Sequence, residues 1–272
     1  MELFMIFIIG LCFGSFLNVC IYRLPKEQSI VKPGSFCPKC NTPIKWYDNI
    51  PLLGYIALRG QCRSCKDKIS FRYPFVELLT GLLFLILFMK FNLTADFYKY
   101  AFFFSLLIAV SVIDIDYHAI PVYFCFIGIV IGLMFSVWET AKFLRFGVTD
   151  YAILPIVESF KGVVFGFGFA YLFKFFGDIL VSFYLQFRKQ ESIEGETESL
   201  GLGDVDFLGM VGVFLGLKGA VLVFFIAPFI AVIYAVFAIT FKKSHLIPYL
   251  PYLSLATLVT FFWGNDILKL IF

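Results

Sequence analysis

The chain has 272 residues, of which 61% are hydrophobic and only 15% charged, and its formal net charge is +3. Soluble domains carry about 25% charged residues, and the mean hydropathy here is +0.91, so the composition excludes a soluble globular domain. Apolar runs long enough to cross a bilayer recur from end to end. The sequence therefore predicts an all-α polytopic membrane protein in contact with the lipid bilayer, with no nucleic-acid partner.

Eight segments are long and apolar enough to be expected as transmembrane helices. They lie near residues 3–22, 74–90, 98–116, 121–138, 160–183, 204–217, 219–240 and 247–264. The first follows Glu2 rather than a basic segment, and no small-residue cleavage site comes after it, so we expect a retained helix and not a signal peptide. The sixth is short and rich in glycine, so we expect it to depend on neighbouring helices.

A polar stretch from residue 23 to residue 73 separates the first two spans and holds four of the seven cysteines. It is too long for a hairpin loop, so it predicts a small extramembrane subdomain. We therefore expect three parts: a first transmembrane helix at 1–22, a cysteine-containing insert at 23–73 and a seven-helix membrane domain at 74–272. A second polar stretch is acidic, and whether its residues 191–198 gate a site stays open.

Basic residues are distributed unequally between the two sides of this topology. With eight spans, 14 Lys and Arg residues fall on the side of the insert and six on the opposite side. Positively charged loops remain in the cytoplasm. We therefore expect the insert to be cytoplasmic, both termini to lie outside, and the chain to cross the cytoplasmic (inner) membrane.

The cysteines of the insert are spaced as metal ligands. Cys37 and Cys40 form one CxxC pair, Cys62 and Cys65 form a second, and 21 residues separate the pairs. Four thiolates at this spacing are typical of a tetrahedral structural Zn²⁺ site. The alternatives are disulfides, which a cytoplasmic location disfavours, and a redox dithiol, which needs only one pair. The insert has few large apolar residues, so a zinc site would supply folding energy that its core lacks.

Two aspartates lie at the ends of apolar segments, Asp114 after one run and Asp204 before another. A carboxylate within a span costs about 2.5–3.5 kcal/mol, so it usually faces an interior and has a function. Two of them suggest an aspartyl pair in which one activates water and the other, protonated, polarises a carbonyl. The alternative, capping of helix ends, is the preferred interpretation for Asp116 and Asp206.

The fifth span contains three charged residues, Lys161, Lys174 and Asp178. Lys174 and Asp178 are four residues apart, so we expect them to pair on one helix face. Gly162, Gly166 and Gly168 in the same span predict close helix packing, not catalysis.

Four segments resemble, in the same order, the sequence blocks of the bacterial type IV prepilin peptidases. They are GSFLNVCIYRLP at 14–25, YPFVELLTG at 73–81, DIDYHAIP at 114–121 and GLGD at 201–204. The last is similar to the GxGD signature of intramembrane aspartyl proteases. The family often has a lysine at the position that Asp206 occupies here, and this departure changes the charge beside the motif.

The resemblance implies an eight-helix enzyme that cuts the basic leader from prepilins and pseudopilins, usually between Gly and Phe. By motif position its catalytic residues are Asp114 and Asp204. Relatives that carry the cysteine insert also methylate the new N-terminal amine with S-adenosylmethionine, so the resemblance implies a bifunctional peptidase and N-methyltransferase. Its substrates would belong to type IV pili, type II secretion or competence systems.

The methyl-donor site cannot be identified from a motif, because the chain has no glycine-rich dinucleotide fingerprint. Polar residues that border the insert are the candidates: Asn18, Arg23, Arg72 and Glu77. For Glu77, a helix-start carboxylate stabilised by the macrodipole is an equally compatible interpretation.

Two alternative functions stay open at this stage. The first is a GxGD intramembrane protease without methyltransferase activity, which the cysteine insert and the 14–25 block disfavour. The second is an ion-coupled transporter, in which membrane carboxylates relay ions. A transporter of that kind predicts an internal repeat and counter-ions near the midplane. We find no repeat, and both key aspartates lie toward one side.

Overall fold

The computed structural model describes residues 1–118, 122–147, 151–188, 198–240 and 248–271. The regular elements within these ranges are all helical, and pairing of extended backbone is limited to two isolated bridges in the insert. The chain divides into two compact units, Met1–Ala119 and Ile120–Phe272, which are described separately. The predicted all-α class is confirmed, while the predicted division into 1–22, 23–73 and 74–272 follows expected position relative to the bilayer and stays a prediction.

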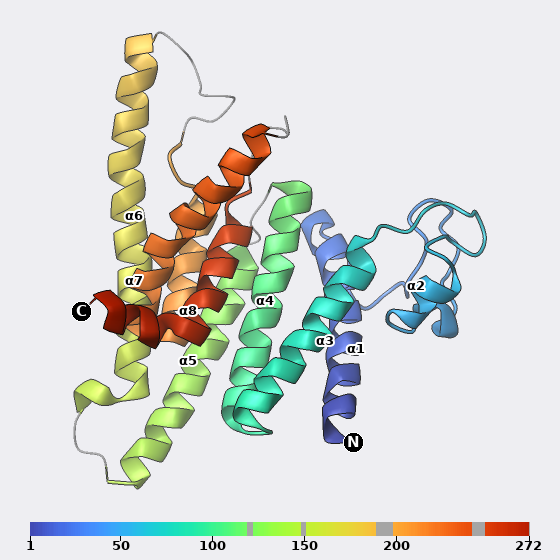
Figure 1. The fold of residues 1–272 in the computed structure, drawn as a ribbon, viewed down its shortest axis with the longest axis horizontal. Helices are drawn as coiled ribbons and strands as arrows, with labels where there is room; N and C mark the ends of the chain where they lie inside the picture. The colour runs from blue at the N-terminus through green and yellow to red at the C-terminus, as the bar shows by residue number, and fades with distance from the viewer. Residues whose placement is uncertain (119–121, 148–150, 189–197, 241–247, 272) are drawn as a thin grey trace. The chain divides into compact units, whose positions relative to one another are not determined.

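Unit 1 contains three long helices, α1 (Glu2–Arg23), α3 (Arg72–Phe91) and α4 (Ala95–Tyr117) (Figure 1). Helices α1 and α3 touch along glycines, because a Cβ on Gly10 would lie 2.9 Å from Gly81 Cα and one on Gly14 would lie 2.7 Å from Glu77 Cα. Small residues allow helix backbones to approach this closely in membranes. Unit 1 therefore holds the two ends of the insert side by side.

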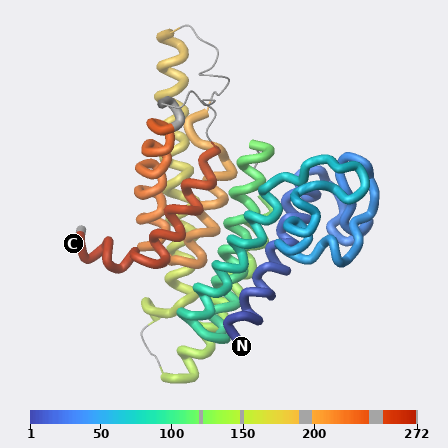
Figure 2. The backbone as a smooth tube through the Cα atoms, turned by 45° about the vertical axis from the view of Figure 1, so that its right-hand side comes forward, coloured from blue at the N-terminus to red at the C-terminus, as the bar shows by residue number. Residues whose placement is uncertain are grey.

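The insert leaves α1 and returns at α3 through short elements. These are the 3₁₀ turns Leu24–Lys26 (η1) and Trp46–Asn49 (η2) and the helix α2 (Leu53–Ala57). The backbone of this segment forms irregular loops at the end of α1 opposite the N-terminus, as the tube in Figure 2 shows. The insert packs as part of unit 1.

Unit 2 contains α5 (Val122–Arg145), the 3₁₀ turn η3 (Tyr151–Ile153), α6 (Pro155–Arg188), α7 (Leu202–Thr240) and α8 (Leu250–Ile271). The predicted glycine contacts of the fifth span are confirmed at two positions. A Cβ on Gly162 would lie 2.7 Å from the Gly212 carbonyl carbon, and one on Gly166 would lie 2.8 Å from that of Leu208. Helices α6 and α7 are therefore in backbone contact, with antiparallel register.

Helix α7 is interrupted at Gly216, whose φ of 68° and ψ of −174° are not helical. Only glycine adopts such a conformation readily. Gly162 of α6 packs near Gly212 and Gly216. Two turns further along α6, Phe169 makes an edge-to-face contact with Phe224, and their ring centroids are 4.8 Å apart. The chain therefore turns back at Gly216, and the predicted spans 204–217 and 219–240 are the two halves of α7.

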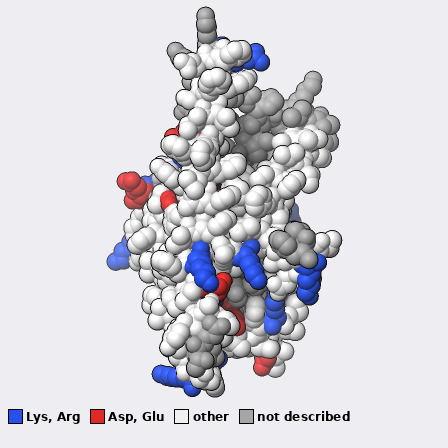
Figure 3. Space-filling view, turned by 90° about the vertical axis from the view of Figure 1, so that its left-hand side faces the viewer, with Lys and Arg blue, Asp and Glu red and all other residues white. Residues whose placement is uncertain are grey.

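Six of the described helices are long and apolar enough to cross a membrane: α1, α3, α4, α5, α6 and α7. With α7 divided at Gly216 and α8 included, the described residues provide eight long helical segments, one for each predicted span. Large apolar side chains are exposed along them, for example Phe176 and Phe187 of α6. On the face in Figure 3, most of the described surface is uncharged. Such a surface suits lipid and not water.

Candidate functional site

The four predicted metal-ligating cysteines meet in unit 1. The Sγ atoms of Cys37, Cys40, Cys62 and Cys65 all lie within 4.8 Å of one another. Two of these distances are 3.9 Å, between Cys37 and Cys65, and 4.0 Å, between Cys40 and Cys62. A disulfide would bring two sulfurs to about 2.0 Å, whereas four thiolates about 2.3 Å from a central Zn²⁺ are about 3.8 Å apart. The cluster therefore fits a tetrahedral metal ion and not disulfides.

The two CxxC pairs lie in tight turns of the same construction. The Cys37 N–H donates to Thr42 O at 3.0 Å, and the Cys62 N–H donates to Asp67 O at 2.8 Å. The residue after each second cysteine, Asn41 or Lys66, has a positive φ of 54° or 61°. Each turn places its two thiols on one side, so the two CxxC sequences form two turns of the same geometry.

Local hydrogen bonds favour the thiolate form of one ligand. Thr42 Oγ1 lies 3.2 Å from Cys40 Sγ, and the hydroxyl and the backbone of Thr42 lower the pKa of the Cys40 thiol to about 6. Because metals bind the thiolate, this lowered pKa favours Cys40 as a ligand, whereas burial and the other three sulfurs raise the pKa of Cys65 to about 11.

An ion pair that the sequence did not predict connects the turn η2 to the second CxxC pair. Arg63 Nε donates to Asp48 Oδ2 at 2.8 Å and Arg63 Nη2 donates to Asp48 Oδ1 at 2.6 Å. These bonds lower the pKa of the Asp48 carboxyl and raise that of the Arg63 guanidinium. Bidentate pairs of this kind fix orientation as well as charge. The pair therefore fixes η2 against the second turn.

The four candidate methyl-donor residues, Asn18, Arg23, Arg72 and Glu77, all line one cavity of about 750 Å³ in unit 1. The ends of α1, α3 and α4 and the insert enclose it. Its volume is within the range of small-molecule sites. The structure thus brings together residues that are up to 59 positions apart in the chain.

Asn18 is one of two candidates, with Arg72, that have an unused buried polar atom. It is 3% exposed, its Nδ2 donates to Tyr73 O at 3.0 Å, and its Oδ1 is buried with no hydrogen-bond partner among the described residues. A buried acceptor without a donor costs free energy unless a ligand or water supplies one. Asn18 therefore marks a point in the cavity where a hydrogen-bond donor is missing.

The other candidates have partners inside unit 1. Arg23 donates to Ser29 O at 2.9 Å and to Gly34 O at 2.8 Å, so its guanidinium holds the start of the insert. Arg72 forms an ion pair with Asp116, and its Nε is buried without a partner in the described chain.

Glu77 is 8% exposed and accepts a hydrogen bond from the Leu52 N–H at 2.9 Å. It lies beyond the first turn of α3, so it binds the insert and does not act as a helix-start carboxylate.

Asp114 lies in the last turn of α4 and is 7% exposed. Asp116, two residues on, faces Arg72, so the two carboxylates point to different sides of α4 as predicted. The helix ends at Tyr117, and His118 has a left-handed φ of 49° with its N–H bonded to Asp114 O. His118 is exposed, so it does not extend the Asp114 face of the helix.

Asp204 lies in unit 2 at the third residue of α7 and is 6% exposed. Its Oδ2 accepts a hydrogen bond from the Gly201 N–H at 3.2 Å. A carboxylate that reaches back in this way caps the start of a helix, so Asp204 has the capping contact that the sequence favoured only for Asp116 and Asp206. Gly201 permits this geometry, because a Cβ there would lie 3.2 Å from the same oxygen.

The predicted pair of Lys174 and Asp178 is confirmed, with Nζ and Oδ2 3.0 Å apart. Lys174 also donates to Glu198 Oε2 and to Leu200 O, at 2.5 and 2.8 Å. Most of the acidic stretch 191–198, for which a gating role was left open, lies outside the described residues; Glu198 is its described end.

Two family models match the chain. The bacterial peptidase A24 N-terminal domain matches residues 8–91, and the type IV leader peptidase family matches residues 101–236, which is half of the sequence. The chain belongs to the type IV leader peptidase family. The first match covers α1, the cysteine insert and α3, and the second includes both buried aspartates.

Curated members of the family are similar over most of the chain. A prepilin leader peptidase/N-methyltransferase of Klebsiella pneumoniae is 36% identical over 78% of this chain and 84% of its own length. A type 4 prepilin-like proteins leader peptide-processing enzyme of Escherichia coli O78:H11 is 32% identical over 93% and 91%. A prepilin leader peptidase/N-methyltransferase of Myxococcus xanthus is 36% identical over 77% of this chain but only 55% of its own length. No solved structure matches significantly.

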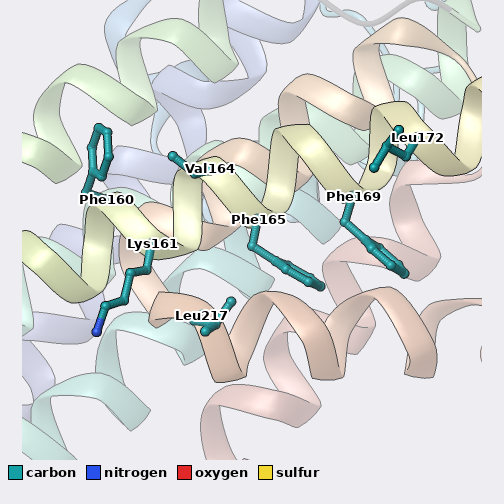
Figure 4. A pocket seen from close by; sticks show the side chains of 7 residues that line it. All are labelled: Phe160, Lys161, Val164, Phe165, Phe169, Leu172 and Leu217. Atoms are coloured by element: carbon teal, nitrogen blue, oxygen red, sulfur yellow. The ribbon is translucent and has the colours of Figure 1, made fainter.

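This leader peptidase has a further cavity, of about 500 Å³, on unit 2. Phe165 and Phe169 of α6 point toward the second half of α7, from which Leu217 comes (Figure 4). Lys161 at one end of the cavity pairs with Glu158 at 2.9 Å, so its charge is already balanced. The cavity is an apolar groove on helices that are expected to face lipid, and it offers no second polar group for chemistry.

Proposed function

We propose that this protein removes the leader peptide of type IV prepilins and pseudopilins at the cytoplasmic membrane and then methylates the new N-terminal amine. Curated relatives over nearly the whole chain are named for both activities. The match of residues 8–91 to the bacterial A24 N-terminal domain disfavours a protease without methyltransferase activity, and membership of a peptidase family disfavours a transporter.

The observation that carries the cleavage proposal is the burial of one carboxylate at an end of each of two helices. Asp114 and Asp204 are 7% and 6% exposed. With eight spans, both lie toward the cytoplasmic side, where the basic leader of the substrate begins. In the proposed aspartyl pair the two carboxylates share one proton, so the ionised member takes a proton from water while the protonated member donates to the scissile carbonyl oxygen.

The cysteine cluster is proposed as a structural zinc site in the cytoplasm. Sulfur separations near 4 Å and the paired turns support a tetrahedral Zn²⁺ held by all four thiolates, which leaves no open position for catalysis. The excess of Lys and Arg on the side of the insert supports its cytoplasmic location.

The cavity lined by Asn18, Arg72 and Glu77 is proposed as the methyl-transfer site. S-adenosylmethionine supplies an electrophilic methyl group on a positively charged sulfur. Asn18 Oδ1 can accept a hydrogen bond from an amino group, and the buried Glu77 carboxylate nearby favours a cation in the cavity. Arg23 supports the wall of this site through its bonds to Ser29 and Gly34 and does not contact the ligand.

The proposed function is tested with a synthetic prepilin in detergent solution that contains S-adenosylmethionine, with mass spectrometry as the readout. Wild type should lose the leader and gain one methyl group. Asp114→Asn and Asp204→Asn should each abolish cleavage but still methylate a peptide that is already cleaved. If either variant cuts normally, the aspartate-pair mechanism is wrong; cleavage without methyl gain in wild type would reject the second activity.

The methyl-transfer site is tested by Asn18→Ala, with Asn265→Ala, an exposed asparagine of α8, as the matched control. Loss of a hydrogen bond to a charged group costs about 1.5–3 kcal/mol, so labelled S-adenosylmethionine should bind roughly 10- to 100-fold more weakly, or methylation should slow by that factor. Cleavage should be unchanged in both variants. Equal effects of the two substitutions on binding and methylation would reject the assignment.

A further inference from the structure

Lys174 is a buried lysine next to the start of the helix that carries Asp204. It is 7% exposed, and its ammonium group contacts Leu200 O at 2.8 Å, Asp178 Oδ2 at 3.0 Å and Glu198 Oε2 at 2.5 Å. A lysine has three N–H donors, so these three acceptors satisfy it completely. One of the three is a backbone carbonyl, which an ion pair alone does not require.

The peptide group between Leu200 and Gly201 connects this lysine to Asp204. Its carbonyl oxygen accepts from Lys174 Nζ, and its N–H, on Gly201, donates to Asp204 Oδ2 at 3.2 Å. The two ends of a peptide group are electronically coupled by resonance. A cation at the oxygen therefore strengthens the N–H as a donor, and bonds in such a chain reinforce one another.

Three residues of α6, Lys174, Gly177 and Asp178, contact residues 199 and 200, and we call these three residues the α6 seat. The Ser199 N–H and Oγ–H both reach Asp178 Oδ1, at 2.7 and 2.8 Å. Gly177 lets Ser199 approach, since a Cβ at that position would lie 2.7 Å from Ser199 Cβ. Helices α6 and α7 lie side by side in both ribbon and tube views. The start of α7 is thus fixed by α6 and not only by its own helical bonds.

We propose that Lys174 is a positioning residue for peptide cleavage: it holds and polarises the Leu200–Gly201 peptide group so that its N–H orients the Asp204 carboxylate. The inference rests on the proposed function only in that Asp204 is taken as catalytic. A purely structural ion pair with Asp178 and Glu198 is the competing explanation. The two differ because only the first gives the contact with Leu200 O a role in the reaction.

The test measures prepilin cleavage and, separately, methylation of a peptide that is already cleaved, in full-length protein. Lys174→Met should lower kcat roughly 10- to 100-fold with KM within about twofold, less than the roughly 100- to 1,000-fold for loss of a donor at the reacting atoms, because Lys174 acts through a peptide group. Lys174→Arg should restore most of the rate, since it keeps charge and donors. The control Lys161→Met removes another α6 lysine that pairs with an acidic residue, and it should leave both activities unchanged.

Two further variants separate the explanations. Glu198→Gln weakens the ion pair but leaves the Leu200 contact, so cleavage should stay within about threefold of wild type. The proposal is overturned if Lys174→Met cleaves with the kcat of wild type, or if Glu198→Gln loses as much cleavage as Lys174→Met. If Lys174→Met also loses methylation, its fold is damaged, and the cleavage rates of Glu198→Gln and Lys174→Arg then decide between the two explanations. Normal cleavage by Asp204→Asn would instead reject the proposed function itself.

Discussion

The contact between α6 and α7 provides a sharp test of how this fold is held together. Gly162→Ala would place a Cβ 2.7 Å from the Gly212 carbonyl carbon and 2.9 Å from that of Gly216. Carbon atoms in contact are about 3.5–4.0 Å apart, so the two backbones must separate by roughly 1 Å. Because both neighbours are backbone atoms, no side chain can rotate to relieve the overlap.

Such overpacking typically costs about 1–3 kcal/mol. Gly168→Ala is the matched control on the same helix, because a Cβ there meets no atom within 4 Å. Alanine is favoured over glycine inside a helix by about 0.5–1 kcal/mol, so this variant should be neutral or slightly stabilised. Comparing the two variants separates the effect of helix packing on stability from that of helix propensity.

The assay is thermal unfolding of both variants in one detergent at one scan rate. At about 2–4 °C per kcal/mol for a unit of this size, Gly162→Ala should melt about 2–12 °C below wild type, and Gly168→Ala at or above it. Cleavage should fall in the first variant as the Asp204 helix is displaced from α6, while methylation, assigned to unit 1, should persist. Equal melting temperatures for the two variants would refute the close contact.

Three more predictions concern the insert and the α6 seat. Zinc removal by a chelator, or Cys37→Ser, should make the insert sensitive to protease while the helical circular dichroism of the membrane spans persists; an unchanged digestion pattern would argue against a structural metal. Arg63 holds the pKa of Asp48 below its ordinary value of about 3.9, so the ionised carboxylate stabilises the insert above that pH, and this stability is lost as the pH falls through the lower, folded-state pKa. Asp48→Asn should remove that step from the acid dependence of pepsin digestion, and a step of unchanged size would contradict it. Gly177→Ala should slow cleavage and spare methylation, because it pushes Ser199 off the seat; normal cleavage would speak against that contact.

Much of the fold was predictable because each membrane helix corresponds to a continuous apolar run in the sequence. The predicted boundary between residues 217 and 219 lies beside Gly216, where α7 departs from the helical conformation. The clustering of the four cysteines was predictable because each CxxC pair lies within one tight turn.

The residues that the sequence did not single out act through backbone groups or distant partners. Asp48 resembles any loop aspartate until Arg63 folds against it, and the Asp116 carboxylate, predicted as interfacial, proves to be the partner of Arg72. The pairing of Lys174 with Asp178 followed from their spacing. The hydrogen bond from Lys174 to Leu200 O could not be predicted, since every residue has a backbone carbonyl and the sequence does not show which one a lysine contacts.

The end of α4 relates the two proposed activities to each other. Asp114 and Asp116 are two residues apart, so they project from different sides of one helix, and Asp116 lines the cavity proposed for methyl transfer. A helix with its side chains is about 10–12 Å across. Under the two proposals, cleavage at Asp114 releases a new amine within roughly that distance of the methyl-transfer cavity. The second reaction can then follow the first by a short displacement of the pilin N-terminus, without release of the pilin from the membrane.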